Sequence, residues 1–240
     1  MTEETTESKE IGVVGRIIGI FTSPTETLQS IDQKPNWIIP FLIGIICFLI
    51  FQYSTLDIQM QYQIAKLEAR DLPAEQLDIA KNQMQGPMKY LGFIVGPIMV
   101  PIIWAIFAGL FLLAGNWMIG GQTSFKKLFS MVAWVSLIGS LSLILLTFLI
   151  VSKGTIHGIA MDLSVLLTTP DIGEETSLLH RIFSKIDLFV IWQVVLWTIG
   201  MSVAYKTTTK KAAVPILSLW GLWIVVSVTF GSLFGDKLGM

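Results

Sequence analysis

Long apolar segments without any charged residue constrain this sequence more than any other feature. A helix of about 20 residues spans a hydrocarbon core of roughly 30 Å, so segments of this length are typical of transmembrane helices. With 53% hydrophobic and only 14% charged residues, the chain also lies outside the range of ordinary soluble domains. The sequence therefore predicts an all-α integral membrane protein with five transmembrane helices, forming one domain over residues 37–240. The five segments lie at about residues 37–53, 91–119, 128–151, 188–205 and 212–234.

The stretch before the first span, "FTSPTETLQSIDQKPNW", carries the signals of a short surface helix. Ser23 is a good N-cap, and Pro24 suits the first helical position. Glu26 stands three residues after the cap, as a capping box requires. The pattern predicts a helix from Pro24 to about Ile31.

Residues 11–36 as a whole are predicted to form one or two amphipathic helices in the membrane interface, after a disordered polar tail at residues 1–10. Anchoring the chain is the favoured role of this segment, and binding a partner is left open. Pro35 ends the segment. Trp37 is predicted to anchor the first span at the membrane boundary, because indole combines an apolar ring with a polar N–H.

The loops between the spans differ in length and charge. Residues 54–90 are rich in helix formers and broken near Pro73, which predicts a short helical hairpin outside the bilayer. The loop between the third and fourth spans is also long and polar. The two short loops hold lysines with no acidic residue beside them, and such loops favour the cytoplasmic side. We therefore expect a cytoplasmic N-terminus and an outer C-terminus in a cell membrane. The lysines are Lys126, Lys127, Lys206, Lys210 and Lys211.

The spans contain no Asp, Glu, Lys, Arg or His. Ionisable residues inside the membrane mark proton relays, ion-coupled transport and intramembrane catalysis, so we expect no enzymatic activity and no cofactor. The single cysteine, Cys47, excludes disulfides within the chain, and no basic patch with interleaved aromatic residues suggests nucleic-acid binding. One loop offers nitrogen and oxygen ligands in a spacing that matches no metal motif, and we interpret these residues as solvated. They are His157, Asp171, Glu174, Glu175 and His180.

The second span, "GFIVGPIMVPIIWAIFAG", combines a GxxxG spacing with two prolines. Small residues let another helix approach closely, and a proline frees a carbonyl and invites a kink. Broken helices also line substrate paths in transporters, but packing is the favoured interpretation. The residues are Gly92, Gly96, Pro97 and Pro101, with Gly231 and Gly235 as a similar pair in the fifth span. The uncharged polar residues of the spans are interpreted as bridges between helices; they include Asn116, Ser136, Ser140, Gln193 and Thr198.

The order of these features resembles the Yip domain family of five-span membrane proteins. The resemblance rests on "FTSPTETLQSI", "KPNWIIPFLIG", "GGQTSFKKLFSMVAWVSLIGSL" and "IDLFVIWQVVLWTIGMSVAYKTTTKKA", and extends from about Val14 to Phe234. It implies a five-helix bundle with a cytoplasmic N-terminus and no known enzymatic activity. The eukaryotic branch implies Rab GTPases as partners. This sequence lacks the long cytoplasmic tail and the Asp-Leu-x-Gly-Pro motif of that branch, so Rab binding is not carried over, and the chain is more similar to the prokaryotic branch.

The leading hypothesis is a non-enzymatic membrane scaffold or adaptor that binds other membrane proteins or itself. Its binding surface would be a cytoplasmic face formed by the N-terminal helix, with Arg16, and by the five lysines of the two short loops. These loops serve equally well as topology determinants that touch anionic headgroups of the lipid bilayer. The alternative function is passage of a small neutral solute or a lipid through the helix bundle.

Overall fold

The computed structural model describes residues 11–69, 73–174 and 176–238. Within these residues the chain forms α-helices, two short 3-10 helices and one isolated antiparallel bridge between Asp162 and Asp187. The long helices are α3 (Ile38–Glu68), α5 (Leu91–Met118), α6 (Phe125–Lys153), α8 (Leu188–Ala204) and α9 (Thr209–Leu238). The shorter ones are α1 (Val13–Thr22), α2 (Pro24–Gln33), α4 (Ala74–Gln85), η1 (Pro87–Tyr90), η2 (Leu163–Leu166) and α7 (Leu178–Phe183).

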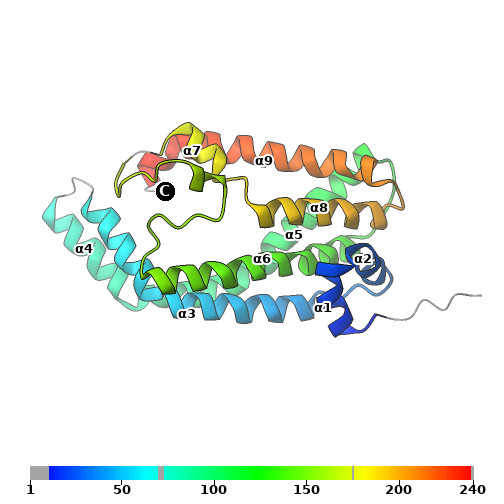
Figure 1. Cartoon of the computed structure of the whole chain (residues 1–240), viewed down its shortest axis with the longest axis horizontal. Coiled ribbons are helices and arrows are strands. Elements are labelled where there is room, and N and C mark those ends of the chain that lie inside the picture. Colours follow the sequence, from blue (N-terminus) through cyan, green and yellow to red (C-terminus); the bar gives the residue numbers. More distant parts are fainter. Residues whose placement is uncertain (1–10, 70–72, 175, 239–240) are drawn as a thin grey trace, which may run out of the picture.

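The long helices run side by side, and the shorter elements gather at the two ends of the bundle (Figure 1). At one end lie α1 and α2 together with the α5–α6 loop (residues 119–124) and the α8–α9 loop (residues 205–208). We call this the loop end. The opposite end carries α4, α7 and η2. The chain thus brings its N-terminal helices and both short lysine-bearing loops to the same end.

Helix α6 forms the centre of the bundle, because it packs against α3, α5 and α8. Its first half is buried almost continuously, with Trp134 1% exposed and Ile138 fully buried. The Trp134 indole donates to the Asn36 carbonyl oxygen at 2.6 Å, which satisfies its one polar atom. This contact fixes the start of α3 against α6.

The outer faces of the bundle are apolar. Ile46 of α3, Leu113 of α5 and Val225 of α9 are 57%, 70% and 63% exposed. Four helices are long and apolar enough to cross a membrane: α3, η1 with α5, α6, and α9 up to Ser232. Helix α8 is equally apolar but has only 17 residues. By length and composition the described part of the chain therefore gives four candidate spans, where the sequence predicts five.

Helix α3 is longer than the span predicted from the sequence, which ends at Tyr53. The helix continues to Glu68, because no glycine or proline interrupts the polar stretch after Tyr53. The polar residues after Tyr53 limit how much of α3 can lie in the hydrocarbon core. They do not end the helix. The expected hairpin is present as the end of α3 followed by α4, with Lys81 and Glu68 paired at 2.6 Å.

The predicted capping box at Ser23 is wrong. Helix α2 does begin at Pro24, but the Ser23 side chain makes no capping hydrogen bond. Ser23 instead joins two helices directly: its N–H donates to the Gly19 carbonyl oxygen at 2.8 Å, and its own carbonyl oxygen accepts from Thr27 Oγ1 at 3.0 Å. Its φ of −140° and ψ of 60° form a tight turn between the two helices and differ from the extended backbone of a usual N-cap. The helix also continues two residues past Ile31, to Gln33.

Candidate functional site

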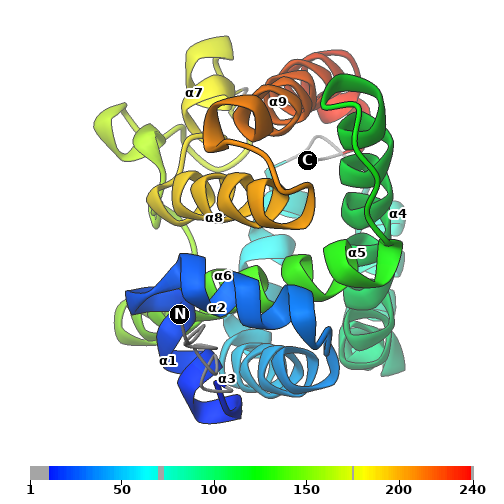
Figure 2. The ribbon, with the colours of Figure 1, turned by 90° about the vertical axis from the view of Figure 1, so that its right-hand side faces the viewer.

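The loop end is covered by α1 and α2, which pack on the bundle as an ordered pair (Figure 2). Helix α2 contacts α8 and α6, and α1 contacts α2 and α6. Ile20, Leu28 and Ile31 are fully buried in this contact. Burial of a side chain of this size stabilises by about 1.5–3 kcal/mol, so the pair is held firmly. Neither helix is a loose appendage of the bundle.

Arg16 does not belong to the basic surface to which the sequence assigned it. It is only 8% exposed, and its guanidinium group points inward from α1 to the end of α2. It donates to Ser30 Oγ at 3.1 Å, to the Ser30 carbonyl oxygen at 2.9 Å and to the Lys34 carbonyl oxygen at 3.0 Å. The last carbonyls of a helix have no partner within it, and a planar five-donor group suits them well. Arg16 therefore ties α1 to α2.

Lys127 is also not an unbalanced cation. Its Nζ lies 2.8 Å from Asp32 Oδ2, on α2, and the two side chains are 33% and 14% exposed. The acid that balances Lys127 comes from 95 residues earlier in the chain, so the loop sequence alone does not reveal it. Four predicted lysines are exposed at the loop end: Lys126, Lys206, Lys210 and Lys211.

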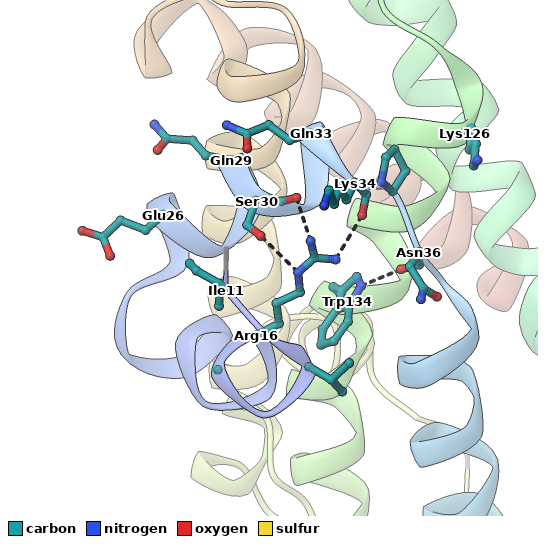
Figure 3. Close-up of a pocket in the computed structure, with 14 residues that line it drawn as sticks. Ile11, Arg16, Glu26, Gln29, Ser30, Gln33, Lys34, Asn36, Lys126 and Trp134 are labelled. Atoms are coloured by element: carbon teal, nitrogen blue, oxygen red, sulfur yellow. Dashed lines mark hydrogen bonds between the residues drawn. The ribbon is translucent and has the colours of Figure 1, made fainter. Parts of the chain in front are cut away.

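A cleft of about 1110 Å³ opens between α1, α2 and the start of α6 (Figure 3). Arg16 and Trp134 contribute to its inner wall, and exposed polar side chains of α2 and the α2–α3 connection contribute to its rim. A second cleft of about 380 Å³ lies beside α2 and the α8–α9 loop. The larger cleft is lined by Ile11, Gly12, Val13, Gly15, Arg16, Glu26, Gln29, Ser30, Gln33, Lys34, Pro35, Asn36, Lys126 and Trp134.

The GxxxG pair of α5 packs against α3. A Cβ atom at Gly92 would lie 2.6 Å from Gln52 Nε2, and one at Gly96 would lie 2.2 Å from the Phe48 ring. Pro97 and Pro101 follow within the same helix, which continues unbroken to Met118. These contacts favour the packing interpretation of the second span.

A third close approach, which the sequence pattern did not reveal, involves Tyr205 at the end of α8. A Cβ at Gly115 would lie 2.4 Å from its ring. The Tyr205 hydroxyl donates to Asn116 Oδ1 at 2.9 Å, and the Leu112 carbonyl oxygen lies at 3.1 Å as a second acceptor. Asn116 thus bridges two helices, as predicted. Three other predicted bridges bond to carbonyls of their own helices instead: Ser136, Ser140 and Thr198.

Trp37 and Gly231, two of the predicted positions near the ends of the spans, both contact neighbouring elements. Trp37 is half-buried, with its ring centroid 5.7 Å from that of Phe41 and 5.5 Å from that of Phe129. The Gly231 carbonyl oxygen accepts a hydrogen bond from Arg181 of α7, which fastens the connection between α6 and α8 to α9. The surroundings of Gly235 lie outside the described part of the structure.

No group of three or more His, Cys, Asp or Glu side chains among the described residues could hold a metal ion. His157 instead lies beside Tyr62, with the ring centroids 6.4 Å apart. Glu175, another of the loop residues considered as ligands, lies outside the described residues.

Comparison with known proteins agrees with this architecture. A model of the Yip1 domain matches residues 18–231. The chain therefore belongs to the Yip1 domain family. This Yip1-domain protein is also similar to a protein of Bacillus subtilis (strain 168) named membrane protein YknW, with 25% identity over 220 residues, covering 90% of this chain and 89% of that relative. No solved structure matches it significantly. The family and the apolar helices together make this chain a membrane protein.

Proposed function

We propose that this Yip1-domain protein is a non-enzymatic scaffold or adaptor of the cell membrane, which binds other membrane proteins or a second copy of itself through the loop end. One observation carries the proposal: α1 and α2, which cross no membrane, are fixed on the bundle by Arg16, by the Asp32–Lys127 pair and by buried apolar contacts. A segment that only tethered the chain would not need this fixed geometry. An ordered surface built from α1, α2 and two loops suits recognition of a partner.

The proposal places the loop end in the cytoplasm and the C-terminus outside. This requires α8 to cross the membrane as a fifth span. Its 17 residues rise about 25 Å at about 1.5 Å per residue, and local thinning of the bilayer accommodates the small shortfall. Support for the orientation comes from the lysine-bearing loops, which lie at the same end as α1 and α2 (Figure 1).

Passage of a solute or lipid through the bundle is not adopted, because no feature of α5 favours it. A solute path beside Pro97 would need free space next to Gly92 and Gly96. The side chains of Gln52 and Phe48 fill that space. The partner also need not be a Rab-type GTPase, since the motif associated with those partners is absent from the sequence.

Site-specific photo-crosslinking in native membranes tests the scaffold. A photoreactive amino acid is placed at Gln33 or Thr209, both exposed at the loop end, and at Gln83 or Thr168, both exposed near the opposite end. We expect a protein adduct of defined mass from the first pair of sites and none from the second. Adducts only at Gln83 and Thr168, or lipid adducts alone at all four sites, would contradict the proposal.

A further inference from the structure

The two N-terminal helices turn different surfaces outward. The exposed face of α2 is polar and consists of Thr25, Glu26, Gln29 and Gln33. The exposed face of α1 is mainly apolar, with Val14 68% and Ile18 57% exposed one helical turn apart. Arg16, the only charged residue of α1, is buried, so this helix presents no charged side chain outward. An outer face of this kind favours contact with hydrocarbon over contact with water.

The two helices also lie at different levels of the bundle. A Cβ atom at Gly200, close to the end of α8, would lie 3.7 Å from Leu28 Cδ2 of α2. At the end of α1, the Phe21 ring packs edge-on against Trp192 of α8, with the ring centroids 5.9 Å apart. Trp192 precedes Gly200 by about two helical turns, which is about 12 Å along the axis of α8. Helix α1 therefore lies nearer the middle of the bundle than α2 does (Figure 1).

The level of α1 is also the level at which the apolar outer surface of the bundle begins. Helix α1 lies crosswise to the long helices and close to the start of α3 (Figures 1 and 2). Helix α3 is a candidate span, and apolar side chains are exposed in its first two turns, with Ile38 52% and Leu42 51% exposed. A helix that lies across the bundle at this level, with its apolar face outward, has the geometry of helices in the interface of a bilayer.

We propose that the outer face of α1, with Val14 and Ile18, inserts among the phospholipids and contacts their acyl chains, whereas the exposed face of α2 lies in water. The sequence predicts the membrane interface for residues 11–36 as a whole. The inference divides that segment, because only α1 combines an apolar outer face with a place nearer the middle of the bundle.

Insertion of α1 has consequences for both lipid and protein contacts. Burial of apolar side chains holds α1 in the bilayer, so lipids with zwitterionic headgroups suffice. The polar face of α2 and the two short loops remain for a protein partner. The inference is independent of the proposed scaffold function, because lipid covers α1 with or without such a partner.

The test measures contact with lipid directly in the full chain. In a Cys47→Ser background, the variants Val14→Cys and Ile18→Cys carry the environment-sensitive fluorophore NBD, and Gln29→Cys, on the exposed face of α2, is the matched control. Each labelled protein is reconstituted into phosphatidylcholine vesicles with and without phosphatidylcholine that carries a doxyl quencher on an acyl chain. We expect blue-shifted emission and quenching of about twofold or more at Val14 and Ile18, and neither effect at Gln29.

Several outcomes would overturn the inference. Weak quenching at all three sites would place α1 in water, and strong quenching at all three would place α2 in the lipid as well. Blue-shifted emission at Val14 and Ile18 without quenching would mean that a second copy of the chain, and not lipid, covers α1. Quenching at only one of these two sites would contradict insertion of the whole face. Because the three labelled positions are exposed, each label should leave the thermal melting temperature at the value of the unlabelled Cys47→Ser protein.

Discussion

At the scale of single residues, Arg16 is a charged side chain that links two helices instead of contributing to a basic surface. A lone arginine in an apolar helix suggests a surface cation, yet this one is buried and serves three acceptors on two residues. Two of the acceptors are backbone carbonyls at the end of α2: that of Lys34, just past the last turn, and that of Ser30, which also accepts from the Lys34 N–H. Its effect on the fold is therefore to join two helices.

Replacing Arg16 by lysine should loosen the joint between α1 and α2. Lysine keeps the charge but has a single donor centre in place of the planar fork, so it cannot reach all three acceptors. We expect a loss of about 2–3 kcal/mol in the free energy of unfolding and faster hydrogen exchange over residues 13–33. Gln33→Ala, an exposed change at the end of α2, is the control and should alter neither measurement. Wild-type exchange in Arg16→Lys would refute the role of the fork.

Gly115 lets the Tyr205 ring, just past the end of α8, lie close to α5, and its replacement by alanine should be costly. The Tyr205 ring over Gly115 is 7% exposed and held by its hydroxyl, so it cannot turn aside for a Cβ atom. We expect Gly115→Ala to destabilise the protein by about 1–3 kcal/mol in denaturant unfolding. Gly109→Ala in the same helix meets nothing within 4 Å and should be neutral or slightly stabilising. If the clash is the cause, Gly115→Ala should cost little in a Tyr205→Ala background.

Some of these residues can be recognised in the sequence and others cannot, because several of their partners lie far away along the chain. The GxxxG pair at Gly92 and Gly96 was found because both glycines belong to one motif on one helix. Gly115 was missed because only Tyr205, 90 positions later, makes it special. The buried role of Arg16 leaves little trace in the sequence for the same reason, since two of its three acceptors are backbone carbonyls, which any residues at positions 30 and 34 would supply. Contacts between distant segments leave little trace in a single sequence.

At the scale of elements, α2 is joined to α6 by the ion pair between Asp32 and Lys127. Because the pair is neither fully exposed nor fully buried, its removal should have an intermediate cost. Lys127→Ala leaves the Asp32 carboxylate mostly buried and without its cation. We expect a loss of about 1–2 kcal/mol and easier proteolytic cleavage between α1 and α3.

A double-mutant cycle separates the pair from other effects of the lysine. Asp32→Asn alone should cost a similar amount, and adding it to Lys127→Ala should cost little more, because the unpaired charge is then removed. Lys126→Ala, one residue away and without this partner, should leave stability unchanged. Additive losses in the double variant would mean that the two side chains act separately.

The elements themselves were more predictable than their contacts. Apolar runs without charge located every long helix, because burial in lipid demands an uninterrupted apolar segment and leaves few alternatives. Their ends were less predictable. Helix α3 passes Tyr53 because helix propensity, rather than hydropathy, decides where a helix stops in water. The capping box at Ser23 does not form because α1 ends at Thr22, so Ser23 is at once the C-cap of α1 and the N-cap of α2.

At the scale of the whole molecule, the bundle separates two kinds of surface. The loop end combines ordered helices, lysines and two clefts, whereas the opposite end carries α4, α7 and the long loop (Figure 1). The path of the chain alternates between these ends: α3, α5, α6 and α9 run along the bundle, and the shorter α8 returns the chain to the loop end (Figure 1). If α6 crosses the membrane, the two short loops lie on the same side only when α8 crosses it as well, so this shared placement and the fifth crossing are one question.

Cysteine labelling answers that question directly. In a Cys47→Ser background, single cysteines are placed at Gln122 and Thr208 in the short loops and at Gln83 and Thr168 near the opposite end, all exposed positions. A membrane-impermeant maleimide added to intact cells should label the second pair, and the first pair should react only after the membrane is opened. Thr168 and Thr208 decide the role of α8, because this helix is the long segment between them. If α8 does not cross, these two sites must react from the same side. Opposite reactivity would require that the 17 apolar residues span the bilayer.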